Sequence, residues 1–230
     1  MKKKFLLFDV DHTLLDFAAS ERKALEKCFH AFGLPFTDEL LTWYLAHNQK
    51  LWSNYERGII PREAIFQARF ADTFTQFALD ADGTLMENAY RKALSHGCDI
   101  MENALILIEK LSKTHQLYIV TNGLASTQEK RLKDSGLAPF FHKTFVSETL
   151  GFQKPMVEYF DYCFEHIPDF EKKEALIIGD SLSSDIQGGI RAGIDTCWFN
   201  PLEKINDTPF QPNYEVKNLL ELLPLLEIEE

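Results

Sequence analysis

The sequence predicts a doubly wound α/β fold of the Rossmann type with an inserted all-helical cap. Three observations support this prediction. Short, continuously apolar runs alternate with amphipathic helical patterns. Polar residues follow directly after several of the apolar runs. A long stretch between the first two runs reads as helix throughout, although a crossover between parallel strands needs only about a dozen residues.

The strands are predicted from five β-rich runs, each nearly continuous in apolar residues, as parallel strands buried on both faces should be. In chain order these runs are Phe5–Val10, Leu117–Thr121, Thr144–Ser147, Ala175–Gly179 and Thr196–Phe199.

Helical patterns separate the later runs, and glycine or proline marks several of their ends. The predicted helices are residues 102–115, 126–135, 156–164 and 183–192. Gly136 and Gly193 stand just past the second and fourth, and Pro155 precedes the third. Such alternation is typical of βαβ units with a parallel sheet.

The inserted stretch reads as four amphipathic helices at about 20–32, 37–57, 61–79 and 82–96. We therefore expect two domains. Residues 1–16 and 98–230 would form the Rossmann-like core, and residues 17–97 would form the helical cap.

Composition excludes several classes of function. The formal net charge of -11 opposes binding to nucleic acid, which needs clustered lysine and arginine. The apolar run after the basic start, Met1–Lys4, is broken by Asp9, so neither a signal peptide nor a membrane span is expected. The four cysteines form no CxxC pair, which favours reduced thiols and a cytoplasmic location. A monomer or weak oligomer is compatible with all of this.

Asp9 and Asp11 close the first predicted strand. Because side chains alternate along a strand, both carboxylates can point to the same side at its carboxyl end. A DxDxT pattern is too short to be diagnostic, and two aspartates could simply cap the turn that leaves the strand. The motif becomes informative only together with other strand ends.

Three further motifs stand at the ends of predicted strands or before a predicted helix. They are Thr121-Asn122-Gly123, Lys154-Pro155, and Gly179-Asp180 followed by Asp185. Each has an ordinary explanation when it is considered alone: a turn, a surface lysine, or an acidic residue in the first turn of a helix. In an open α/β sheet, however, this edge is where ligands bind. The order DxDxT, hydroxyl residue, lysine, GDxxxxD resembles the haloacid dehalogenase superfamily over the whole chain.

Each residue can be given a chemical role. The Asp9 carboxylate can attack phosphorus and form an aspartyl-phosphate, while Asp11 serves as general acid and then base. Asp9, Asp180 and the backbone carbonyl of Asp11 are expected to hold Mg²⁺, with Mn²⁺ as a substitute, and Asp185 is expected to orient that shell. Thr121, Lys154 and the amides of Asn122 and Gly123 are expected to bind the phosphoryl oxygens.

The rival activities differ in specific features. Haloacid dehalogenases of this superfamily need no second carboxylate in the first motif, so Asp11 argues against that activity. A receiver domain of two-component signalling lacks a large helical insertion and carries its phosphorylated aspartate on a middle strand. A catalytically silent phosphate-binding protein would usually have lost a nucleophile or an acid/base residue. Phosphomutases and phosphonate hydrolases resemble this core and differ in the residues that the cap supplies, so both activities stay open.

The cap determines the substrate in such an arrangement. Leu51, Trp52 and Tyr55 fall on one helical side, which suits either cap core or an aromatic wall for a planar group. The segments LWxxYxxGxI and GGIRAGIDTCWFN resemble pyrimidine 5'-nucleotidases of the YjjG/YfnB type. The resemblance implies a nucleoside 5'-monophosphate substrate, with a sugar phosphate or another small phosphomonoester as the alternative. The candidate specificity residues are Phe17, Asn48, Trp52 and Tyr55.

Overall fold

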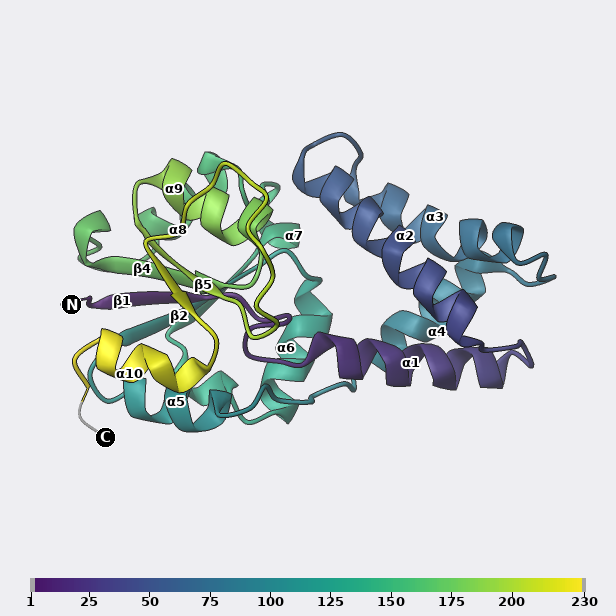
Figure 1. Cartoon of the computed structure of the whole chain (residues 1–230), viewed down its shortest axis with the longest axis horizontal. Coiled ribbons are helices and arrows are strands. Elements are labelled where there is room, and N and C mark those ends of the chain that lie inside the picture. The colour runs from purple at the N-terminus through teal and green to yellow at the C-terminus, as the bar shows by residue number, and fades with distance from the viewer. Residues whose placement is uncertain (1–2, 229–230) are drawn as a thin grey trace. The chain divides into compact units, whose positions relative to one another are not determined.

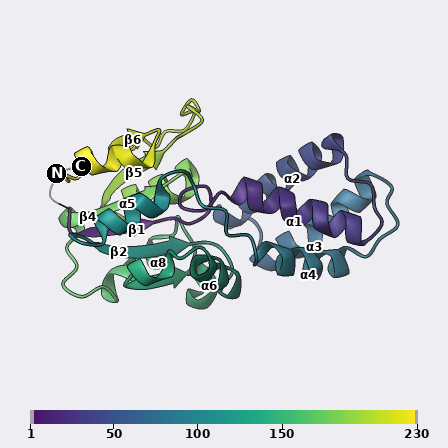
Figure 2. The ribbon, with the colours of Figure 1, turned by 90° about the horizontal axis from the view of Figure 1, so that it is seen from below.

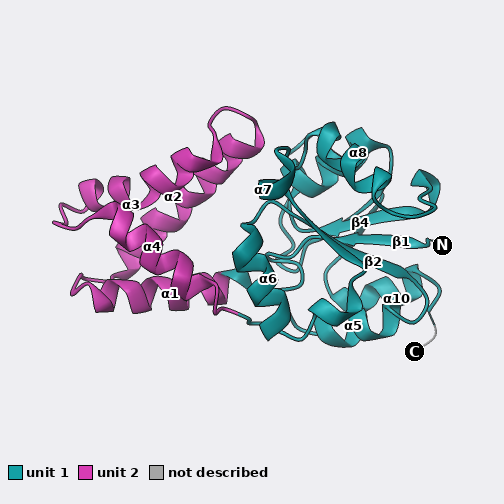
Figure 3. Cartoon of the chain, turned by 180° about the vertical axis from the view of Figure 1, so that it is seen from behind, with its two compact units in different colours: residues 1–17, 98–230 teal, residues 18–97 magenta. Residues whose placement is uncertain are grey.

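A computed structural model describes residues 3–228 of the chain. Residues 1 and 2 of the basic start and residues 229 and 230 of the acidic end lie outside the described range. The chain divides into two compact units, Met1–Phe17 with Cys98–Glu230, and Ala18–Gly97 (Figure 3). None of the helices within residues 3–228 combines the length and the apolar character that a membrane span requires.

The first unit is built on a parallel sheet, which has six strands within residues 3–228, in the order β3-β2-β1-β4-β5-β6. The strands are β1 (Phe5–Phe8), β2 (Gln116–Thr121), β3 (Lys143–Val146), β4 (Ala175–Gly179), β5 (Asp195–Phe199) and β6 (Tyr214–Val216). After β3 the chain crosses over β2 and β1 to place β4 on the other side of β1. The strand order therefore reverses at β1, and in open α/β sheets ligands bind at such a reversal.

Helices cover both faces of this sheet (Figure 1). They are α5 (Ala104–Leu111), α6 (Ala125–Asp134), α7 (Ser147–Leu150), α8 (Val157–Glu165), α9 (Gln187–Ala192) and α10 (Leu222–Leu225). Leu6 and Phe8 of β1 pack with residues of α5, α6 and α10, whereas Phe5 and Leu7 pack with residues of α8 and α9. Alternate residues of a single strand thus enter two separate apolar cores.

The second unit contains α1 (Phe17–Ala31), α2 (Asp38–Glu56), α3 (Arg62–Gln76) and α4 (Gly83–Leu94), of which α1 begins one residue before the unit does. Helix α3 packs against both α2 and α4 (Figure 2). Thr37 caps α2 and Asp82 caps α4, because their side chains accept hydrogen bonds from backbone amides of the first turn. The predicted α/β fold with an inserted helical cap is confirmed.

Charged side chains lie inside this helical unit. Arg69 of α3 donates two hydrogen bonds of 2.7 Å to the carboxylate of Glu87 on α4, and both side chains are buried. The buried Glu21 carboxylate of α1 accepts from Asn48 of α2 at 3.0 Å and from Tyr90 of α4 at 3.1 Å. These bonds connect all four helices and satisfy charges that would otherwise be costly to bury.

The chain leaves the first unit and returns to it through two paired segments. Leu15 and Ile100 form an antiparallel bridge. The Asp16 amide donates to the Asp99 carbonyl at 2.9 Å, and the Met101 amide donates to the Leu14 carbonyl at 3.0 Å. The start and the end of the insertion are therefore held together by backbone hydrogen bonds.

The structure also contains elements that the sequence patterns did not predict. Strand β6 and helix α10 follow the last predicted strand, and the single-turn helix α7 begins at Ser147, where the third strand was expected to end. Strand β1 ends at Phe8, before the predicted Val10, because residues 10–15 form a tight turn. His12 in that turn adopts a left-handed φ of 61°.

Candidate active site

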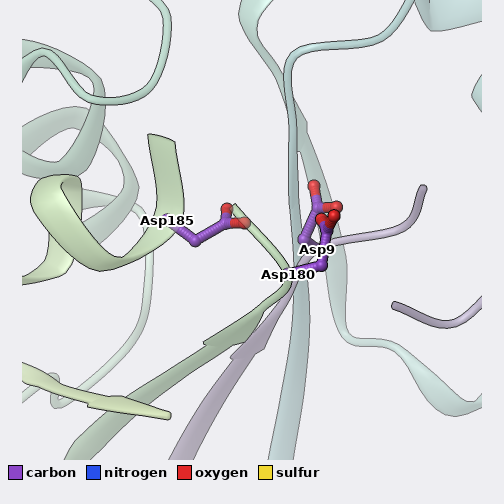
Figure 4. A group of neighbouring side chains, drawn as sticks. All are labelled: Asp9, Asp180 and Asp185. Atoms are coloured by element: carbon purple, nitrogen blue, oxygen red, sulfur yellow. The ribbon is translucent and has the colours of Figure 1, made fainter. Parts of the chain in front are cut away.

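Three carboxylates converge beyond the carboxyl ends of β1 and β4. Asp9 follows β1, Asp180 follows β4, and Asp185 extends toward them from the helical turn Leu182–Ile186 (Figure 4). One carboxylate oxygen from each of the three lies within 4.8 Å of the others. Since β1 and β4 are neighbours at the strand-order reversal, this group lies where ligands bind in open α/β sheets.

Lys154 lies among these carboxylates and is 1% exposed. Its ammonium donates to Asp9 Oδ1 at 2.6 Å, to Asp185 Oδ1 at 2.6 Å and to the Val120 carbonyl at 2.9 Å. Burial alone would lower the pKa of this lysine, but the carboxylates of Asp185 and Asp9 raise it above its usual value. Lys154 is therefore held as a buried cation.

Asn122 fixes the backbone that carries Lys154. Its side-chain amide donates to the Lys154 carbonyl at 3.0 Å, and its side-chain oxygen accepts from the Lys154 amide at 2.9 Å. This reciprocal pair joins the exit of β2 to the loop before α8. The Asn122 side chain thus holds the backbone of Lys154 in place.

Asp185 approaches the end of β4 closely because residue 179 is glycine. A Cβ atom on Gly179 would lie 2.2 Å from Asp185 Oδ2, which no real contact allows. The same oxygen accepts from the Ser181 amide at 3.1 Å. The turn that carries Asp185 has π-helical hydrogen bonding, a feature found often at functional sites.

The electrostatics of the group show an excess of negative charge. Burial raises the pKa of the Asp9 carboxyl, and the nearby Asp185 and Asp11 add to this effect, whereas Lys154 opposes it. Removal from water and the carboxylates of Asp9 and Asp185 likewise raise the pKa of Asp180. Three carboxylates face one ammonium, so a further cation would relieve their repulsion.

The expected phosphate-binding segment, residues 121–123, adjoins this group at the end of β2. The Thr121 hydroxyl accepts hydrogen bonds from the Gly123 amide at 3.1 Å and from Gln128 Nε2 at 2.9 Å. A hydroxyl oxygen has two acceptor positions, and both are therefore occupied. The hydroxyl hydrogen remains available for donation to a ligand. The Gly123 amide, in contrast, is already engaged with Thr121.

Asp11 lies beside the group but faces helix α6. Its Oδ2 accepts from Gln128 Nε2 at 2.8 Å, and its Oδ1 accepts from Arg131 Nη1. The sequence patterns did not single out either partner of Asp11. Their three-residue spacing places both on one face of the helix after Thr121-Asn122-Gly123, but the spacing alone does not show that this face turns toward Asp11.

The four candidate specificity residues fall in different environments. Phe17, at the start of α1, is partly exposed, and its ring centroid lies 5.3 Å from that of His12. Trp52 of α2 is also partly exposed, with its ring 5.8 Å from that of Tyr55. Asn48 and Tyr55 are buried within the helical unit, where Asn48 donates to Glu21 and the Tyr55 hydroxyl accepts from Arg62.

Comparison with known proteins assigns this arrangement to a family. A family model described as haloacid dehalogenase-like hydrolase matches residues 6–199, from β1 through β5. The chain belongs to the haloacid dehalogenase-like hydrolases. The resemblance predicted from the order of the four motifs is thereby confirmed.

One relative, YfnB, is similar to this chain over nearly its full length both in sequence and in structure. The HAD-hydrolase YfnB of Bacillus subtilis is 48% identical over 224 residues, which cover 97% of this chain and 95% of YfnB. A crystal structure of YfnB bound to magnesium matches with a TM-score of 0.95 at 47% identity and covers 99% of this chain and 100% of that one.

Two relatives are named for an activity. The pyrimidine 5'-nucleotidase PynA of Streptococcus pneumoniae is 39% identical over 225 residues, which cover 97% of this chain and 95% of PynA. The pyrimidine 5'-nucleotidase YjjG of Escherichia coli is 31% identical over 226 residues, which cover 98% of this chain and 99% of YjjG.

Proposed function

We propose that this hydrolase is a Mg²⁺-dependent phosphomonoesterase that acts through an aspartyl-phosphate on Asp9. The observation that carries the proposal is the convergence of the carboxylates of Asp9, Asp180 and Asp185 at the strand-order reversal, with Lys154 paired to Asp9 and Asp185. This cluster places a nucleophilic carboxylate beside groups that can neutralise a phosphate.

The donor set fits Mg²⁺. All three side chains offer hard carboxylate oxygens, and they lie close enough to share one ion. We propose that Asp9, Asp180 and the backbone carbonyl of Asp11 hold the ion, with Asp185 orienting the shell. When bound, Mg²⁺ supplies positive charge that neutralises phosphate and nucleophile together. The crystal structure of YfnB bound to magnesium supports this choice, and Mn²⁺ is the expected substitute.

In the first half of the proposed reaction, an Asp9 carboxylate oxygen bonds to phosphorus as the bond from phosphorus to the leaving oxygen breaks. The Asp11 carboxyl gives its proton to that leaving oxygen. In the second half, Asp11 takes a proton from water as the water oxygen bonds to phosphorus and the bond to Asp9 breaks. Asp9 is thereby restored as a carboxylate and Asp11 as a carboxyl group.

The remaining residues hold the phosphoryl oxygens in this proposal. The Thr121 hydroxyl donates its available hydrogen, and Lys154 places its charge against the oxygens as negative charge spreads over them. The amides of Asn122 and Gly123 complete the set. The Gly123 amide would exchange its bond to Thr121 for one to phosphate.

We further propose a nucleoside 5'-monophosphate, and a pyrimidine nucleotide in particular, as the substrate. The near full-length similarity to PynA and YjjG supports this assignment. A sugar phosphate is the alternative. We propose that residues 17–97 act as the cap, with Phe17 and Trp52 offering ring surface to the base. Asn48 and Tyr55, being buried, would contribute by fixing the position of α2.

Release of inorganic phosphate from a panel of nucleoside monophosphates, sugar phosphates and an aryl phosphate tests these proposals. We expect turnover with Mg²⁺ or Mn²⁺, none with a chelator, and the fastest rates with pyrimidine nucleotides. Asp9→Asn should abolish turnover without unfolding the protein. A folded sample that hydrolyses nothing would refute the phosphatase proposal, whereas equal rates across the panel would refute only the nucleotide assignment.

A further inference from the structure

Helix α6 presents two buried side chains to Asp11. Gln128 and Arg131 are each 1% exposed. Gln128 Nε2 donates to Asp11 Oδ2 at 2.8 Å, Arg131 Nη1 donates to Asp11 Oδ1, and the same Nη1 donates to Gln128 Oε1 at 3.1 Å. The three side chains therefore form a closed ring of hydrogen bonds in which both Asp11 oxygens are engaged.

We propose that Arg131 and Gln128 are positioning residues that fix the Asp11 carboxyl for proton transfer to the leaving oxygen and from the attacking water. This inference rests on the proposed phosphatase function. Arg131 and Gln128 transfer no proton themselves. They donate N–H hydrogen bonds that restrict the rotation of the Asp11 side chain, and fixed geometry of this kind contributes strongly to rate.

Gln128 also aligns the acid/base residue with the phosphate-binding residue. Its Nε2 atom donates both to Asp11 Oδ2 and to the Thr121 hydroxyl oxygen at 2.9 Å. The bond to Thr121 occupies an acceptor position on the hydroxyl and so directs the hydroxyl hydrogen away from Gln128. One side-chain amide thereby sets the position of Asp11 relative to the proposed phosphate site.

Gly123 leaves space for the Gln128 side chain, and the Phe17 ring contacts Arg131. A Cβ atom on Gly123 would lie 2.6 Å from Gln128 Nε2, so a larger residue at this position would displace the Gln128 side chain. The guanidinium carbon of Arg131 lies 5.5 Å from the centre of the Phe17 ring, within cation–π range.

Differences in exposure separate the reacting group from its supports. The Asp11 side chain is 26% exposed, whereas the Arg131 side chain is 1% exposed. Asp11 therefore keeps an accessible side for a reacting group while its partners are covered. A carboxylate oxygen can accept more than one hydrogen bond, so neither contact from α6 blocks proton transfer at Asp11.

The test compares Arg131→Met, Arg131→Lys and Gln128→Leu with Lys130→Met. Lys130 lies on the same helix but pairs with Asp134 at the surface, so it serves as the matched control. We measure kcat and KM for the best alkyl phosphate of the panel and for nitrophenyl phosphate. Arg131→Met should lower kcat for the alkyl phosphate by about 100-fold while KM changes by less than about twofold.

Two features distinguish positioning of Asp11 from a purely structural role. The loss should be smaller for nitrophenyl phosphate, whose leaving group needs less protonation. Arg131→Lys should recover part of kcat, because lysine keeps one charged donor. Gln128→Leu should also lower kcat, and since it leaves no buried charge unpaired, it remains informative if Arg131→Met does not fold.

The decisive measurement adds Arg131→Met and Gln128→Leu, each separately, to Asp11→Asn. Arg131→Met should have almost no further effect on the residual kcat, because a residue that acts through Asp11 has nothing left to position. Gln128→Leu should cost less kcat than it does in the presence of Asp11, because only its bond to Thr121 is then lost. Equal losses in the presence and absence of Asp11, or an unchanged kcat per folded molecule in both variants, would overturn the inference. A wild-type enzyme without phosphatase activity would instead refute the proposed function on which the inference depends.

Discussion

Lys154→Met should destabilise the metal-free protein strongly. The substitution removes the three hydrogen bonds of the buried ammonium and leaves the carboxylates of Asp9 and Asp185 facing each other without their cation. Breaking a buried ion pair in this way costs about 3–5 kcal/mol of unfolding free energy. For a chain of this size each kcal/mol corresponds to about 2–4 °C, so we expect the Tm to fall by about 6–20 °C.

The assay is thermal unfolding of wild type and variant in the presence of a chelator, followed by the same measurement with Mg²⁺. Added Mg²⁺ should reduce the difference in Tm between wild type and variant, because the ion supplies positive charge that the variant lacks. Lys130→Met is the control, since the exposed pair of Lys130 with Asp134 is worth only about 0.3–0.5 kcal/mol. A Tm of Lys154→Met within about 2 °C of the wild-type Tm in chelator would show that the buried lysine does not stabilise the group of carboxylates.

Three further predictions concern the metal group, the end of β2 and the helical unit. Asp180→Asn should weaken Mg²⁺ binding by at least about tenfold, because a charged oxygen ligand is lost; the Mg²⁺ concentration that gives half-maximal activity measures this. Gly123→Ala should lower kcat by about tenfold, because the new Cβ lies 2.6 Å from Gln128 Nε2; an unchanged kcat would contradict the contact. Arg69→Met should destabilise the helical unit by about 3–5 kcal/mol, because Glu87 is left buried without its partner. In this variant, amide hydrogen exchange should become faster in α3 and α4 than in the sheet. Equal exchange in both units would contradict the predicted local destabilisation.

Much of the fold followed from the sequence because apolar continuity and strand-to-helix alternation both point to the same architecture. The missed strand β6 is only three residues long and has the exposed Glu215 at its centre, so it carries no apolar run to detect. Its pairing with β5 comes from tertiary contacts, not from local pattern. Helix α7 is likewise a single turn, which is too short for a periodic signal.

Some residues of the candidate site could be predicted from the sequence, and others could not. Asp9, Thr121 and Asp180 were placed by their positions at strand ends, which the parallel sheet brings to one edge. Gln128 and Arg131 belong to a helix whose sequence, ASTQEKRLKD, looks like a solvated polar surface. Only the rotation of α6 against the sheet shows that this face is buried, and no single-sequence pattern fixes that rotation.

The backbone pairing between residues 14–16 and 99–101 has a consequence for how this architecture can be modified. Because the chain departs and returns at one ladder, the intervening residues form a closed loop on the core. Loop-closure entropy rises only slowly with length, by about 0.6 kcal/mol for each doubling. Insertions of different size and sequence can therefore be exchanged at this point while the chain path through the sheet is kept. The paired segments thus act as a modular junction, at which the helical insertion can change while the sheet and its group of carboxylates are kept.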